Sequence, residues 1–192
     1  MTANEKAPNE TVMTMPIPIE QVAAFAEGPF QGNPAAVCPL QSWLPDPIMQ
    51  AIAAENNLSE TAFYVGREGR YALRWFTPRC EVDLCGHATL AAGHVVFLHE
   101  PHLDEVEFRS NSGPLIVRRQ GDQLILNFPV QPVCSCLAPG GVDEILGTTA
   151  EACFLGVDLM VVVADQHEVE ALAPDSAAVA ELPGRGLIVT AP

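Results

Sequence analysis

Basic residues are scarce in this sequence of 192 residues. Nine lysines and arginines stand against 24 aspartates and glutamates, which gives a formal net charge of −15. Nucleic acids and anionic membrane surfaces are bound through basic faces, so this charge balance argues against both kinds of partner. No apolar run reaches the roughly 18 residues that a membrane-spanning helix needs. We therefore expect the protein to bind neither nucleic acid nor membrane.

The cysteines lack the spacing that is typical of disulfide frameworks or metal sites. The chain has six of them and no Cys-x-x-Cys pair, and nothing resembling a secretion signal precedes them. Cys134 and Cys136 have no second pair and no nearby histidine, so the pattern does not favour a metal site there. We interpret the six as reduced thiols of a cytoplasmic protein, and we expect neither a metal nor a cofactor.

The chain does contain enough apolar sequence to form a core. Hydrophobic residues make up 48% of it and charged residues 17%, which is typical of globular proteins. Residues 1–15 are polar and without periodicity, which predicts a disordered leader. Residues 16–128 alternate strand and helix patterns, and residues 129–149 carry the prolines and glycines of a linker or crossover. Residues 150–192 predict a partial second half, and the chain from residue 131 onward is strongly acidic, with too few elements to close a core of its own.

Two stretches predict helices in the first part of the chain. Asp46 and Pro47 are typical of a helix start, with Asp46 as the cap. Ile48 and Ile52, with Leu44 or Met49, are expected on the buried side. The stretch from Gly86 to Leu98 has helix length and is apolar on all sides, so it must be surrounded by protein. This pattern predicts a sheet wrapped around one central helix. Strands are expected at 17–24, 35–38, 59–65, 71–76, 105–109, 114–119, 124–128, 159–163 and 187–190, with short helices at 143–147 and within 167–180.

Three side chains that are able to move or steer protons lie between Ser59 and Thr89. Glu60 belongs to a predicted strand, Cys85 precedes the buried helix, and His87 lies in its first turn. Helix N-termini present free N–H groups and a partial positive charge to anions. A carboxylate that faces such a helix start would suit proton transfer. Each residue also has an ordinary structural explanation, as a capping carboxylate, a small apolar residue or a core histidine.

Ordered sequence blocks resemble the PhzF-like family of phenazine-biosynthesis-type isomerases and epimerases, which have the diaminopimelate epimerase fold. The blocks agree in order and spacing, so the match is specific over about residues 16–128 and loose over 129–192. They are Phe30-Gln31-Gly32-Asn33-Pro34-Ala35-Ala36-Val37, Glu55-Asn56-Asn57-Leu58-Ser59-Glu60-Thr61-Ala62-Phe63, Arg74-Trp75-Phe76-Thr77-Pro78 and Glu81-Val82-Asp83-Leu84-Cys85-Gly86-His87-Ala88-Thr89-Leu90.

The resemblance implies an α+β fold in which a mixed, mostly antiparallel sheet wraps around a central buried helix. It further implies two similar halves with the active site between them. Glu60 would act as general acid and base, moving a proton between carbons of a small carboxylate substrate without a cofactor. Asn33 is a candidate substrate contact, although a role in shaping the turn is the simpler explanation for it. A homodimer is the candidate assembly. The residues expected to hold the substrate carboxylate are Gly86, His87, Ala88 and Thr89.

The second half departs from the family pattern. Family members are longer and carry an Asp-Pro-x-Thr-Gly-Ser block that supplies an aspartate and a serine to the site, and nothing in residues 131–192 matches it. This departure predicts either a truncated chain with an incomplete second half or a cleft that a partner chain completes. The alternative function is then an inactive remnant that binds small carboxylates or only oligomerises.

Cys85 supports a further alternative. The related proline racemases and diaminopimelate epimerases place a catalytic cysteine directly before the matching glycine, as Cys85 precedes Gly86 here. A thiol at a helix N-terminus is expected to have a lowered pKa, as a base requires. Those enzymes use two such cysteines, however, and no second matching block exists in this chain.

Overall fold

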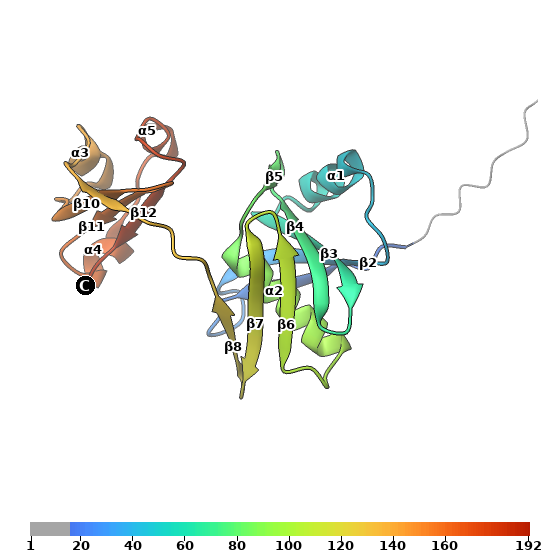
Figure 1. The fold of residues 1–192 in the computed structure, drawn as a ribbon. Coiled ribbons are helices and arrows are strands. Elements are labelled where there is room, and N and C mark those ends of the chain that lie inside the picture. Colours follow the sequence, from blue (N-terminus) through green and yellow to red (C-terminus); the bar gives the residue numbers. More distant parts are fainter. Residues whose placement is uncertain (1–15) are drawn as a thin grey trace, which may run out of the picture. The chain divides into compact units, whose positions relative to one another are not determined.

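The computed structural model describes residues 16–192 and divides the chain between Phe128 and Pro129 into two units (Figure 1). Each unit has a hydrophobic core of its own. The predicted leader, residues 1–15, lies outside the described residues. No helix in the described part of the chain combines the length and the hydropathy needed to cross a membrane.

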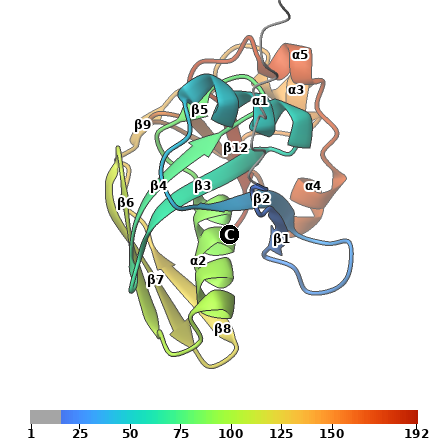
Figure 2. The same ribbon diagram turned by 90° about the vertical axis from the view of Figure 1, so that its right-hand side faces the viewer.

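The first unit is built on one eight-stranded sheet that curls around a helix (Figures 1 and 2). Two neighbouring pairs, β2 with β3 and β4 with β6, are parallel, and the other pairs are antiparallel. The predicted α+β class with a mixed, mostly antiparallel sheet is therefore confirmed. The strands, in their order across the sheet, are β1 (Glu20–Ala24), β2 (Asn33–Leu40), β3 (Glu60–Arg67), β4 (Arg70–Phe76), β6 (Glu105–Ser110), β7 (Gly113–Gln120) and β8 (Gln123–Asn127), while β5 (Glu81–Val82) pairs with β4.

Helix α2 (Gly86–His99) lies inside the curled sheet, as Figure 2 shows. It contacts β1, β2, β3, β7 and β8, and nine of its residues are buried. Gly93 marks the closest approach, because a Cβ built there would lie 2.8 Å from Val117 Cγ1 on β7. The sheet wrapped around one apolar helix, as the sequence predicts, is thus observed.

Helix α1 (Asp46–Asn56) covers the opposite face of the sheet. Because side chains alternate along a strand, Ala62 and Tyr64 of β3 face α2 while Phe63 packs with α1. The predicted buried side of α1 is confirmed for Met49, which is buried together with Ala53, and wrong for Ile48, which is exposed. Ile52 and Leu44 are partly buried against the same cluster.

Asp46 is not the cap of α1, contrary to the prediction. Pro45 occupies the cap position and Asp46 is the first helical residue. Its carboxylate accepts a hydrogen bond of 2.8 Å from Arg74 on β4 instead, and this pairing draws the side chain away from the free N–H groups of the helix.

The second unit has a four-stranded sheet and three short helices. Part of the predicted linker 129–149 belongs to its core, because α3 places Val142 and Leu146 in one cluster with Leu159 and Val161, and Cys136 of β9 packs against that cluster. The expectation that this region cannot close a core is therefore wrong. The elements are β9 (Cys134–Cys136), α3 (Val142–Leu146), β10 (Ala152–Leu155), β11 (Leu159–Val162), α4 (Gln166–Ala171), α5 (Ser176–Val179) and β12 (Leu187–Thr190), with the strand order β12-β11-β10-β9.

Candidate active site

Glu60 is the first residue of β3 and shares the strand face of Ala62, which packs toward α2. Its Oε2 lies 3.2 Å from Nε2 of His87, in the first turn of α2. The two atoms are not aligned for a hydrogen bond, and Oε2 is buried without a hydrogen-bond partner among residues 16–192. A buried, unpartnered carboxylate oxygen is costly, so this atom is a strong candidate for contact with a ligand or a transferred proton.

His87 connects the candidate residues through both of its ring nitrogens. Its Nε2 lies 3.4 Å from Ser59 Oγ as well as close to Glu60, and its Nδ1 lies 3.4 Å from Cys85 Sγ. Burial lowers the pKa of His87, against the opposing effects of the Glu60 carboxylate and the Pro34 carbonyl. The imidazole is therefore neutral at neutral pH, with one nitrogen as donor and the other as acceptor.

Cys85 is the N-cap residue of α2 and is buried. The pKa of its thiol is raised to about 12, mainly by burial and also by the nearby Glu60 carboxylate, against the opposing effect of the Ala88 N–H. The predicted lowering of this pKa by the helix N-terminus is therefore wrong, because desolvation outweighs the helix contribution. A thiol that stays protonated at neutral pH is poorly suited to act as a base.

The start of α2 supplies backbone N–H groups near these side chains. The first N–H groups of a helix have no partner within the helix, so those of Gly86, His87 and Ala88 are available to an anion. The Thr89 hydroxyl is engaged within the helix, where it donates a 2.5 Å hydrogen bond to the Cys85 carbonyl. The contacts of Gly86, His87, Ala88 and Thr89 with a substrate carboxylate stay a prediction.

Asn33 connects to the candidate site through Ser59, which the sequence analysis did not select. Ser59 Oγ donates to Oδ1 of Asn33 over 3.2 Å and lies 3.4 Å from His87 Nε2. Asn33 begins β2 and Ser59 directly precedes β3, and these two strands are parallel neighbours. The position of Ser59 beside Glu60 in the Leu-Ser-Glu-Thr motif is the signal that could have identified it.

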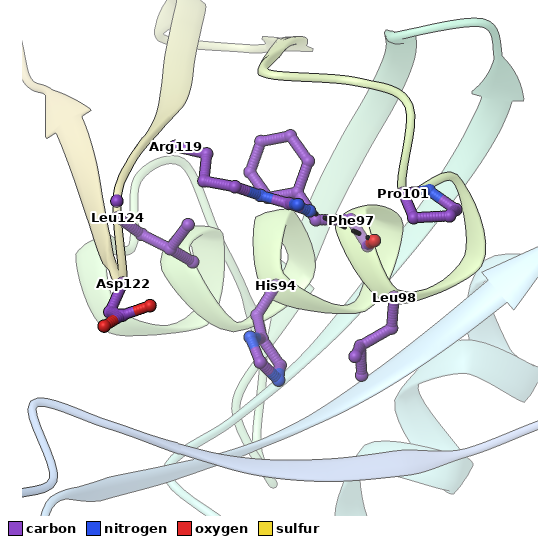
Figure 3. Close-up of a pocket in the computed structure, with 8 residues that line it drawn as sticks. His94, Phe97, Leu98, Pro101, Arg119, Asp122 and Leu124 are labelled. Atoms are coloured by element: carbon purple, nitrogen blue, oxygen red, sulfur yellow. Dashed lines mark hydrogen bonds between the residues drawn. The ribbon is translucent and has the colours of Figure 1, made fainter.

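Two cavities of the first unit lie along later turns of α2 instead. One, of about 410 Å³, is lined by His94, Phe97 and Arg119 among others (Figure 3). There the Arg119 guanidinium lies 4.7 Å from the centre of the Phe97 ring and donates to the Phe97 carbonyl. The other, of about 730 Å³, extends from His94 to β1 and the loop that follows it. Neither cavity is lined by Glu60, Cys85 or His87.

Residues 22–192 match the model of the PhzC-PhzF family, which is described as phenazine biosynthesis-like protein. The chain belongs to this family. Two uncharacterized isomerases of Pseudomonas aeruginosa are 54% and 45% identical to it over 181 and 179 residues. Each alignment covers 92% of this chain and 69% of the relative. These names agree with the predicted class of enzyme, an isomerase.

A solved structure agrees with the family. The crystal structure of a PhzF family phenazine biosynthesis protein from Enterococcus faecalis matches with a TM-score of 0.85 at 46% identity, over 92% of this chain and 69% of that one. The structure of a predicted epimerase from Pseudomonas aeruginosa shares the fold with a TM-score of 0.69 at 19% identity, over 89% and 68% of the two chains. The predicted family and fold are therefore confirmed, whereas the roles of single residues and the incomplete second half stay predictions.

Proposed function

We propose that this PhzF-family protein is a cofactor-independent isomerase or epimerase that moves a proton between carbons of a small carboxylate substrate. The observation that carries the proposal is the Oε2 atom of Glu60, which is buried, lacks a hydrogen-bond partner among residues 16–192 and lies beside the first turn of α2. The family and the names of its relatives supply the reaction class, and the site supplies the group that performs it.

Glu60 is the proposed general base and acid. Its carboxylate takes a proton from one carbon of the substrate, and the electron pair of the broken C–H bond stays on the substrate as a delocalised carbanion. The same carboxyl group then returns the proton to another carbon on the same face of the substrate. His87 is neutral, so it orients Glu60 without fixing a competing positive charge beside it.

The substrate carboxylate is proposed to bind the free N–H groups of Gly86, His87 and Ala88. An anion at a helix N-terminus gains about 0.3–1 kcal/mol at exposed sites and up to about 2 kcal/mol in partly buried ones. The larger figure corresponds to roughly a thirtyfold preference for a carboxylic acid over its amide. It is too small to hold a substrate alone, so further contacts must contribute, and Asn33 with Ser59 is a suitable pair.

The alternative is a protein that binds small carboxylates without turning them over. The other alternative, a racemase that uses Cys85 as its base, is disfavoured by the raised pKa of that thiol.

A solvent-exchange screen tests the proposal. The full chain is incubated in D2O with a panel of small carboxylic acids that carry an activated C–H bond, and proton NMR follows loss of the C–H signal. We expect enzyme-dependent deuterium incorporation into at least one acid and much slower exchange in its amide. Binding without exchange would support the non-catalytic alternative, and the absence of both would contradict the proposed site.

A further inference from the structure

Glu60, Cys85 and His87 bring three different metal-ligating groups to one point. A carboxylate oxygen, a thiol sulfur and an imidazole nitrogen, one from each residue, all lie within 4.8 Å of one another. All three side chains are largely withdrawn from solvent, with exposed fractions of 18% for Glu60 and 9% for His87, and Cys85 is buried.

The separations suit one tetrahedral ion. Zn²⁺ lies about 2.3 Å from a thiolate sulfur and about 2.0 Å from an imidazole nitrogen, so two such ligands on one ion are about 3.5 Å apart. The observed distance between Cys85 Sγ and His87 Nδ1 is 3.4 Å. A carboxylate oxygen of Glu60 lies within 4.8 Å of ligand atoms of both residues and supplies the third ligand.

We propose that Glu60, Cys85 and His87 bind one thiophilic divalent cation of the Zn²⁺ type, and that this ion inhibits the protein. Binding displaces the thiol proton to solvent and forms bonds from the ion to Cys85 Sγ, His87 Nδ1 and a Glu60 oxygen. The fourth position is left to water. A soft thiolate combined with imidazole and carboxylate selects Zn²⁺ or Cd²⁺ over Mg²⁺ or Ca²⁺, which prefer oxygen ligands alone.

Inhibition follows from the use of the same carboxylate for two purposes. Glu60 cannot accept a substrate proton while its oxygen is bound to the ion, and the ion also occupies the space beside the start of α2. This consequence rests on the proposed function, whereas the binding itself does not. The ion is an inhibitor in this account, so the expected reaction still uses no metal.

Measuring the binding of Cd²⁺ and Zn²⁺ to the reduced, tag-free full chain tests the proposal. Cd²⁺ is the optical probe, because a cadmium–thiolate bond gives a near-ultraviolet charge-transfer band, and Zn²⁺ affinity is measured by calorimetry. The background carries Cys80→Ser, Cys134→Ser and Cys136→Ser, which removes the cysteines that are not buried. We expect one equivalent of Cd²⁺ to saturate the band in this background.

Cys85→Ala in the same background should abolish the band and weaken Zn²⁺ binding at least about 100-fold, because even the loss of an outer-shell partner costs 10- to 100-fold. Glu60→Gln, which keeps the thiol and the shape of the side chain, should weaken Zn²⁺ binding at least tenfold. A band that survives in Cys85→Ala, or a Zn²⁺ affinity unchanged in a folded Glu60→Gln variant, would overturn the proposal. Chelator-reversible loss of activity then tests inhibition separately from binding.

Discussion

Gly93 lies where α2 comes closest to the sheet, and replacing it with alanine should destabilise the protein. The new Cβ would lie 2.8, 3.1 and 3.2 Å from the three side-chain carbons of Val117. Val117 is fully buried in β7, and its β-branched side chain has little freedom to rotate away. Either α2 or β7 must therefore shift.

Two opposing effects determine the size of the change. Overpacking a well-filled core costs about 1–3 kcal/mol. Alanine in place of glycine inside a helix gains about 1 kcal/mol. We therefore expect Gly93→Ala to lower the free energy of unfolding by about 0.5–2 kcal/mol, where an uncrowded helix position would show a gain.

Urea unfolding followed by circular dichroism measures this change, and a double mutant isolates its cause. Val117→Ala removes the methyl groups that the new Cβ would meet, so the two substitutions together should destabilise less than the sum of the single ones, by about 1 kcal/mol or more. Gly86→Ala is the matched control, because a Cβ there meets only Phe128 ring atoms at 3.6 and 3.7 Å. A Gly93→Ala variant as stable as the wild type or more so, or strict additivity, would refute the close-packed interface.

Three further predictions concern other parts of the first unit. Burial raises the pKa of Cys38 from its ordinary value of 9.0 to about 12, so between these values the folded state keeps a proton that the unfolded state has lost, and the stability of the wild type falls as the pH rises. In urea titrations between pH 9 and 11, the stability of Cys38→Ala should fall less steeply than that of the wild type, by about 1.4 kcal/mol per pH unit. Equal slopes for the two proteins would count against this prediction. The guanidinium of Arg74 donates to Glu81 through two nitrogens and to Asp46 through the third. Lysine cannot reproduce this arrangement, so Arg74→Lys should lower the free energy of unfolding by about 1–2 kcal/mol. An unchanged melting temperature would show that these hydrogen bonds do not contribute to stability. Gly32 has a φ of +83°, and a Cβ there would lie 2.4 Å from the Ala24 carbonyl oxygen, so Gly32→Ala should lower the free energy of unfolding by at least about 2 kcal/mol. Gly140→Ala is the control and should change stability little, because a Cβ there meets nothing within 4 Å. Equal effects of the two substitutions would contradict the strain argument.

The apolar stretch at 86–98 carries most of what could be predicted about the fold. Its lack of charge and its small residues require protein on every side, and the structure wraps the sheet around α2 accordingly. Within α1 the pattern is less decisive. Ile48 and Met49 are both apolar and adjacent, and only the position of the helix on the sheet determines that Met49 is the buried one.

The candidate site was only partly predictable. Glu60 and His87 lie 27 positions apart in the chain, and it was the family resemblance, not the local pattern, that placed them together. The pKa of Cys85 depends mainly on how deeply the residue is buried. Its position at a helix N-terminus does not reveal this burial, so the direction of the shift could not be predicted from the sequence. Likewise, Asp46 looked like a cap because its partner Arg74 stands 28 positions further along the chain.

The rate of solvent hydrogen exchange in Glu60→Gln tests the central claim most directly. The assay uses a carboxylate substrate identified by the D2O screen, and Glu55→Gln, which alters an exposed carboxylate on α1, is the matched control. Because general acid–base catalysis contributes about 10²–10⁴-fold, we expect Glu60→Gln to lose at least about 100-fold in exchange rate while Glu55→Gln keeps the wild-type rate. Exchange in a folded Glu60→Gln variant that is as fast as in the wild type would contradict the assignment of Glu60 as the base.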